Sequence, residues 1–150
     1  QPGTARALGA SFTIAGPGGR RTVGAEEFFV DYFTTAVGPD EILVSVSFPK
    51  YTGWGANYQK LNRTAQAWAI VGVAAWRGAN GSGVALVNMG STPVLAASVS
   101  SALAGGASVS DAAQLAAAEA EPQNDLNASP EYRVHLAKVL VRRALEESSK

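Results

Sequence analysis

Cysteine is absent from this chain of 150 residues, and histidine and methionine occur once each. A chain without cysteine cannot form a disulfide, a cysteine-bound iron–sulfur cluster, a zinc ribbon or a thiol nucleophile. The absence of cysteine also fits a cytoplasmic protein, which is the location we expect. The one histidine, His135, falls in a predicted helix without a serine or carboxylate signature beside it, so we expect neither catalysis nor a metal site there.

An excess of charge of one sign is also missing, because 12 basic residues balance 12 acidic ones. Nucleic acids and anionic membrane surfaces are bound by net basic surfaces, so we expect neither as the main partner. No apolar run approaches the roughly 18 to 20 residues of a membrane span, and residues 1–6 lack the apolar core of a signal peptide. Because the chain starts at Gln1 and not at Met, a fragment, a processed product or one piece of a longer subunit is expected.

Hydrophobic residues make up 47% of the chain, enough for a real core, and the first two thirds carry strand patterns. The Gly-Pro-Gly-Gly run at 16–19 predicts a β-hairpin, and residues 26–29 predict a short turn or helical piece. Residues 41–48 alternate, with Ile42, Val44, Val46 and Phe48 on one face, which predicts a half-buried strand. We expect strands over residues 10–15, 20–23, 41–48, 54–61, 67–77 and 84–89.

The segment 67–77 could be a buried strand or a helix by periodicity, and its branched Ile70, Val71 and Val73 favour a strand. The Asn-Gly-Ser-Gly run at 80–83 is a turn signal. The last three strands therefore predict an antiparallel meander.

The last third of the chain predicts helices over 93–103, 109–121 and 130–147. Ser91 or Thr92 could cap the first of these, and Ser108 or Ser110 the second. Ser129-Pro130-Glu131 has the features of a helix start: a cap, a proline in the first turn and an acid near the positive end of the dipole. Strands first and helices last predict the α+β class and not a doubly wound sheet.

The stretch 28–43 carries Phe28-Phe29, then Tyr32, then Gly38-Pro39-Asp40-Glu41-Ile42-Leu43. This stretch resembles the FAD-binding (medium) subunit of the molybdenum hydroxylases, the family of carbon monoxide dehydrogenase and xanthine dehydrogenase. Further segments resemble that subunit in the family's order, namely residues 16–23, 58–63, 68–75, 89–94 and 125–133. The resemblance implies that residues 1–50 are the C-terminal end of the second FAD-binding subdomain and residues 51–150 the family's C-terminal α+β domain.

The resemblance also implies a function, which lies mostly outside this chain. Electrons would leave the substrate at a molybdopterin centre in a large subunit and pass through two [2Fe–2S] clusters in a small subunit. They would then reach FAD here and go to an external acceptor. The N-terminal FAD domain would be a third partner, and this chain alone would be inactive.

Site residues carried over from the family lie close to the flavin ring. The resemblance places Ile42 and Leu43 there, with Tyr32 as a neighbour of the isoalloxazine. It gives Lys60 the role of a cation toward a flavin carbonyl or the reduced ring, with Gln59 competing for that role. Core packing explains Tyr32, Ile42 and Leu43 as well, and Lys60 could be a solvated lysine.

The family's glycine-rich pyrophosphate loops lie upstream of the matching segments and are missing from this sequence. The glycines at 16–19 lack the strand-to-helix context of a phosphate cradle. Asp40 and Glu41 point to opposite faces of a strand, so an acid/base couple is not expected. The alternative function is a non-catalytic α+β interaction module that has lost FAD binding.

Overall fold

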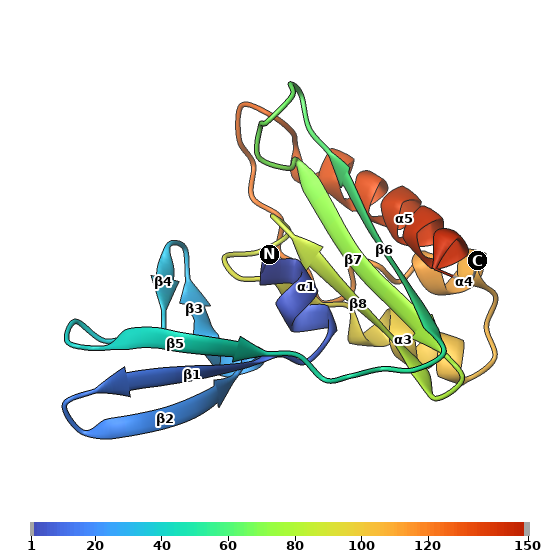
Figure 1. Cartoon of the computed structure of the whole chain (residues 1–150). Coiled ribbons are helices and arrows are strands. Elements are labelled where there is room, and N and C mark those ends of the chain that lie inside the picture. The colour runs from blue at the N-terminus through green and yellow to red at the C-terminus, as the bar shows by residue number, and fades with distance from the viewer. Residues whose placement is uncertain (1, 149–150) are drawn as a thin grey trace.

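The computed structural model describes residues 2–148, which form two larger antiparallel β-sheets and a small two-stranded one, with helices on both sides of the second large sheet (Figure 1). The helices are α1 (Pro2–Ala7), α2 (Ala25–Phe28), α3 (Ala97–Ala104), α4 (Val109–Ala113) and α5 (Pro130–Glu147). The strands are β1 (Ser11–Gly16), β2 (Gly19–Gly24), β3 (Phe29–Asp31), β4 (Thr34–Thr35), β5 (Ile42–Ser47), β6 (Trp54–Leu61), β7 (Val71–Gly78), β8 (Gly81–Val87) and β9 (Val94–Leu95). This order confirms the predicted α+β class.

The first sheet has the strand order β2-β1-β5 and contains the predicted hairpin of β1 and β2. Phe12 and Ile14 of β1 are buried with Ala25 and Phe28 of α2. The rings of Phe12 and Phe28 stack with their centroids 3.8 Å apart. This small cluster covers β1, whereas every residue of β5 is exposed.

A bulge in β5 changes the alternation that the sequence predicted. Thr13 pairs with Ser45, but the next residue, Ile14, pairs with Leu43, so Val44 is the extra residue. Directly paired residues lie on the same face of a sheet, so Leu43 shares the face of Ile14, and Ile42 lies on the opposite face. Val46 pairs with Phe12 and Ile42 with Ala15, so the prediction that Ile42 and Val46 lie on one regular face was wrong.

The second sheet has the order β6-β7-β8-β9, which confirms the meander and adds the short strand β9. Strand β7 begins at Val71, later than predicted, because residues 62–70 form a loop. The loop closes where the Ile70 amide donates to the Leu61 carbonyl at 2.7 Å. Gln66 has a φ of +65° within it, a conformation that a β-strand does not contain.

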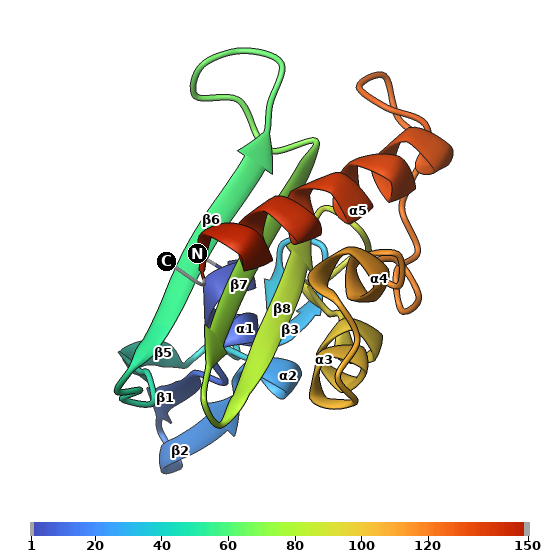
Figure 2. The ribbon, with the colours of Figure 1, turned by 90° about the vertical axis from the view of Figure 1, so that its right-hand side faces the viewer.

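Helices cover the two faces of the second sheet unequally. Helix α5 packs on β6 and β7, and α3 packs on β8, on one side of the sheet, whereas α1 packs on β7 and β8 from the other (Figures 1 and 2). The main core lies under α3, α4 and α5 and includes Val73, Leu86, Val99 and Val141, all fully buried. Strand β7 is covered by α5 on one face and by α1 on the other, which explains why its residues Val71–Ala75 are all buried.

Helix α1 was not predicted, although its sequence carries a start and a stop. Pro2 stands at the helix start, where its missing N–H costs nothing. Gly9 follows the helix with a φ of +62°, the left-handed conformation that commonly ends helices. Six residues give too little periodicity to reveal the helix by pattern alone.

The three C-terminal helices confirm the predicted order but not every boundary. Helix α3 begins at Ala97 without a side-chain cap, so Ser91 and Thr92 do not cap it. The Ser108 hydroxyl caps α4 as expected, yet α4 ends at Ala113, after which residues 114–120 form i→i−3 turns. Helix α5 has the predicted bounds, and the Ser129 hydroxyl accepts from the Tyr132 amide at 3.3 Å.

A buried arginine fastens α5 to the loops at one end of the second sheet. Arg133 is 1% exposed, and its guanidinium donates to the carbonyls of Ile70 and Asn88 and, at 2.7 Å, to the Asp125 carboxylate. The pKa of Asp125 is lowered to about 2, mainly because the amides of Asn127 and Ala128 donate to it, with Arg133 adding to the effect. Within residues 2–148, no helix is long and apolar enough to cross a membrane.

Candidate functional site

The face of β6 that points away from α5 carries Tyr58 and the predicted site residue Lys60. Gly55 shows which face of β6 points toward α5, because a side chain at Gly55 would run into Ser148, just beyond α5. Odd-numbered residues therefore face α5, and Tyr58 and Lys60 face the side on which α1 lies. Gln59 faces α5 and donates to the Asn57 side chain at 2.7 Å, so only one of the two competing residues shares the face of Tyr58.

Tyr58 leans across the sheet toward β7. A Cβ atom built on Gly72 would lie 2.8 Å from the Tyr58 hydroxyl, so the glycine makes room for the ring. Partial burial raises the pKa of this phenol, which keeps the hydroxyl protonated as a hydrogen-bond donor.

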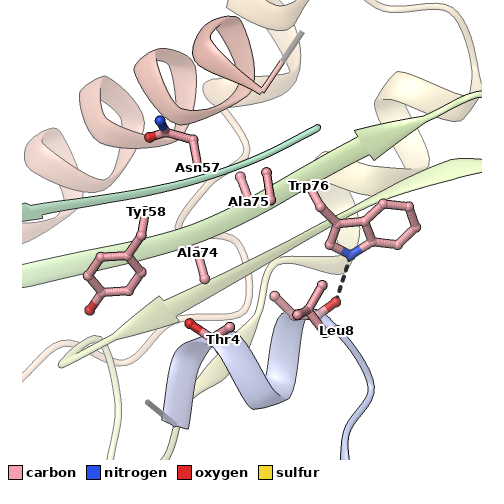
Figure 3. A pocket seen from close by; sticks show the side chains of 9 residues that line it. Thr4, Leu8, Asn57, Tyr58, Ala74, Ala75 and Trp76 are labelled. Atoms are coloured by element: carbon pink, nitrogen blue, oxygen red, sulfur yellow. Dashed lines mark hydrogen bonds between the residues drawn. The ribbon is translucent and has the colours of Figure 1, made fainter. Parts of the chain in front are cut away.

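A cavity of about 250 Å³ lies between this face and α1 (Figure 3). Thr4 of α1 and Leu8 just after α1 line it on one side, and Tyr58 and Ala74 line it from the sheet, while Asn57 points the other way, toward α5. The indole N–H of Trp76 donates to the Ala7 carbonyl at 2.7 Å and so fastens the end of α1 to the sheet.

The two β5 residues expected near the flavin ring are both solvent-exposed. Ile42 is 68% exposed and Leu43 is 39% exposed, and they lie on opposite faces of the first sheet. A flat ring that lies on one side of this sheet can therefore contact only one of the two side chains, unless β5 rearranges.

An ion pair holds the start of β5 in place. The Arg21 guanidinium of β2 donates to both carboxylate oxygens of Glu41, at 3.0 Å and 2.7 Å, and also to the Ala36 carbonyl. The Gly38 amide donates to Glu41 at 2.8 Å. These contacts, with Arg21 the larger, lower the pKa of Glu41 to about 2. Glu41 is therefore a structural carboxylate that is charged at neutral pH, which agrees with the expectation that Asp40 and Glu41 form no acid/base couple.

Tyr32 lies in a different cavity from Tyr58. It belongs to the turn between β3 and β4 and is 46% exposed. It lines a cavity of about 410 Å³ together with Phe33, Trp68 and Pro93. The five predicted site residues thus fall into four places: the α1 side of β6 (Lys60), the α5 side of β6 (Gln59), the β5 strand (Ile42 and Leu43) and the β3–β4 turn (Tyr32).

Among residues 2–148, no group of three or more His, Asp or Glu side chains is arranged to hold a metal ion, and His135 is exposed on α5. The aromatic Tyr58 and the cation of Lys60 lie on one face of β6, whereas the apolar Leu43 belongs to the first sheet. The glycines at 16–19 form the hairpin turn between β1 and β2, so they do not fit the pyrophosphate.

Tyr58 opens the segment 58–63 that resembles the family, but it was not among the predicted site residues. The available signal was the alternation of β6, which places residues 58 and 60 on one face. The flavin roles of Tyr32, Ile42, Leu43, Lys60 and Gln59 stay predictions.

Comparison with known proteins identifies the class. Residues 56–148 match the family described as CO dehydrogenase flavoprotein C-terminal domain, and residues 3–51 match the FAD binding domain in molybdopterin dehydrogenase. The chain therefore belongs to the CO dehydrogenase flavoprotein family, the FAD-binding medium subunits of the molybdenum hydroxylases.

Among its relatives is the carbon monoxide dehydrogenase medium chain of Hydrogenophaga pseudoflava, which is 35% identical over 96% of this chain and 54% of the relative. The medium chain of Afipia carboxidovorans is 31% identical over 98% and 54%. This chain thus spans about half the length of the curated relatives it matches.

Solved structures agree over nearly the whole chain. Carbon monoxide dehydrogenase from Hydrogenophaga pseudoflava has a TM-score of 0.91 at 34% identity, covering 99% of this chain and 55% of that one. Quinoline 2-oxidoreductase from Pseudomonas putida 86 has a TM-score of 0.86 at 25% identity, covering 99% and 55%.

Proposed function

We propose that this chain is the C-terminal part of the flavoprotein subunit of a molybdenum hydroxylase of the carbon monoxide dehydrogenase type. In such a complex it would help to hold the FAD through which electrons pass from molybdenum and [2Fe–2S] centres in partner subunits to an external acceptor. The large molybdopterin subunit, the small [2Fe–2S] subunit and the N-terminal FAD domain would be its partners, in the cytoplasm.

One observation carries this proposal: the fold matches a carbon monoxide dehydrogenase chain over 99% of its length at a TM-score of 0.91. The exposed β5 strand adds support. Its apolar side chains Ile42, Leu43, Val44 and Val46 lie at a sheet edge that remains unpaired within residues 2–148. Such an edge is normally paired or covered, which agrees with an N-terminal FAD domain packing there.

Lys60 is the residue we propose as the electrostatic contact to the cofactor. FAD would supply the redox chemistry, and the protein would tune it through nearby charges. Lys60 lies on the same face of β6 as Tyr58 and pairs with Gly72 of β7, over which the Tyr58 hydroxyl lies. We prefer Lys60 to Gln59 because Gln59 faces α5.

The test replaces Lys60 by Gln in the purified complex and measures the flavin reduction potential. Removal of a positive charge beside the reduced ring should lower the potential, because that charge favours the electron-rich form. Lys138→Gln on α5, on the opposite side of the sheet, is the matched control and should leave the potential unchanged. Equal potentials in both variants would refute the contact.

Native mass spectrometry with an absorption spectrum tests the function as a whole. A complex that contains this chain, flavin, iron–sulfur chains and a large partner supports the proposal. A colourless protein without these partners would favour the alternative, an α+β interaction module that has lost FAD binding.

A further inference from the structure

The cavity between α1 and the second sheet has an aromatic side chain at each end of its sheet wall (Figure 3). Tyr58 of β6 leans over Gly72 of β7, where a side chain would stand in its way. Trp76 of β7 leans over Gly83 of β8 for the same reason. The small Ala74 pairs with Tyr58 and stands two residues before Trp76 on the same face of β7, so it separates the two rings. We name this cavity, of about 250 Å³, the α1 cavity.

Helix α1 forms the other wall and is fastened at its C-terminal end. Thr4 and Leu8 line the cavity from this side and are four residues apart, a spacing that places them on one face of a helical turn. The Ala7 carbonyl accepts from the Trp76 indole N–H at 2.7 Å. The Leu8 carbonyl accepts from the Tyr51 hydroxyl at 3.3 Å. These two hydrogen bonds fix the distance between the two walls.

One end of the α1 cavity is polar and the other is apolar. Thr4 and Tyr58 lie at one end, whereas Leu8 and Trp76 lie at the other (Figure 3). The lining contains no charged side chain, and the Asn57 amide points away from the cavity, toward α5. The hydroxyls of Thr4 and Tyr58 are therefore the polar side-chain groups that a ligand would meet. Among residues 2–148, neither hydroxyl has a hydrogen-bond partner.

The volume of the α1 cavity limits its ligand to a single ring. Apolar cavities of about 150 Å³ in proteins bind benzene, whereas sites for drug-sized ligands span about 300 to 1,000 Å³. At about 250 Å³, the α1 cavity has room for one aromatic ring with a short substituent. A dinucleotide such as FAD is too large to be enclosed by it.

We propose that the α1 cavity binds a neutral, single-ring aromatic molecule that carries one hydrogen-bond acceptor, such as an aromatic ketone. The ring would pack against Leu8 and Trp76, and the ketone oxygen would accept a hydrogen bond from the Tyr58 hydroxyl, with Thr4 beside it. A charged molecule would lose its hydration without meeting an opposite charge. This inference does not rest on the proposed function, because Lys60 is not among the residues that line the cavity.

The test measures binding of acetophenone to the purified protein by isothermal titration calorimetry. α-Methylstyrene has the same shape but carries a methylene group in place of the ketone oxygen, and benzoate is the charged comparison. We expect saturable binding of the two neutral molecules and none of benzoate. Tyr58→Phe removes the hydroxyl and keeps the ring, so it should weaken acetophenone binding about fivefold, as the loss of one neutral hydrogen bond predicts, and leave α-methylstyrene binding unchanged.

Two further variants locate the binding in the α1 cavity. Tyr132→Phe removes a hydroxyl from α5, on the opposite side of the sheet, and is the matched control, which should bind both molecules as the wild type does. Ala56→Leu adds a larger side chain to the cavity lining on β6 and should abolish the binding of both.

Absence of saturable acetophenone binding to the wild type would overturn the proposal. Unchanged binding in both Tyr58→Phe and Ala56→Leu, or equal weakening in Tyr132→Phe, would also overturn it. Flavin content is recorded in parallel, and release of flavin by acetophenone would show that the cavity belongs to the flavin site and would overturn the proposal. An unchanged flavin potential in the Lys60 variant bears only on the proposed function.

Discussion

Gly83 of β8 is the position from which the attachment of α1 can be tested. A Cβ atom built there would lie 2.1 Å from the Trp76 indole nitrogen and 2.8 Å from the Ala7 carbonyl oxygen. Gly83→Ala therefore cannot be accommodated without moving the indole and the end of α1 apart. The hydrogen bond between Trp76 and Ala7 contributes about 1 kcal/mol, and overpacking adds about 1 to 3 kcal/mol.

Against this loss, alanine restricts the unfolded chain more than glycine and returns about 0.4 to 1 kcal/mol. We therefore expect the free energy of unfolding to fall by about 1 to 3.6 kcal/mol. Urea unfolding followed by circular dichroism measures this change, and hydrogen exchange should rise in residues 2–8.

Gly18→Ala is the matched control, because no atom lies within 4 Å of a Cβ built at Gly18. It should change the free energy of unfolding by no more than about 0.5 kcal/mol. Equal unfolding midpoints for the two variants, with unchanged exchange in α1, would refute the reasoning.

Three further predictions concern the ion pairs and the β3–β4 turn. Glu41 has a pKa of about 2 in the folded protein against 4.5 when unperturbed, so its contribution to stability is present above pH 4.5 and is lost as the pH falls toward 2. Glu41→Gln should therefore flatten the dependence of the unfolding free energy on pH between 4.5 and 2, and an unchanged dependence would contradict this role of Glu41. Arg133→Met removes the donor to the carbonyls of Ile70 and Asn88 and should lower the unfolding free energy by about 1 to 3 kcal/mol, measured by urea unfolding; a loss within error of wild type would contradict the role of Arg133. Tyr32→Ala in the complex should alter flavin reduction but not substrate oxidation at molybdenum, and unchanged flavin potential together with unchanged turnover with an external acceptor would contradict a flavin-proximal Tyr32.

Elements with long, regular patterns could be predicted from the sequence with their boundaries. Strand β6 and helix α5 have the expected bounds because each carries its own signal, alternation in the one and the Ser129-Pro130 start in the other. The end of α4 could not be predicted. The Ala-rich segment favours a helix locally, but the Glu121 amide donates to the Met89 carbonyl at 2.9 Å, and this distant contact fixes where the segment must pass.

The candidate site was predictable in its residue types and not in its grouping. Lys60 and the β5 residues could be named from the family resemblance. The bulge at Val44, which separates the faces of Ile42 and Leu43, depends on the pairing of β5 with β1 and leaves no mark in the sequence of β5. Likewise, nothing in the sequence indicates that Trp68 and Phe33 meet, because they come from separate loops that only the packed sheets bring together.

Helix α1 connects the two halves of the chain in a way that the predicted division at residue 50 does not capture. By sequence it precedes the first sheet, yet it packs on the second: a Cβ on Gly3 would lie 2.5 Å from Val87, and Ala7 is buried with Ala74 and Ala85. The cavity beside Tyr58 has one wall from α1 and the other from β6 and β7. The division at residue 50 stays a prediction about sequence families, whereas the packing of α1 makes the cavity beside Tyr58 a product of both segments. Any account of cofactor binding on that face must therefore include residues from both.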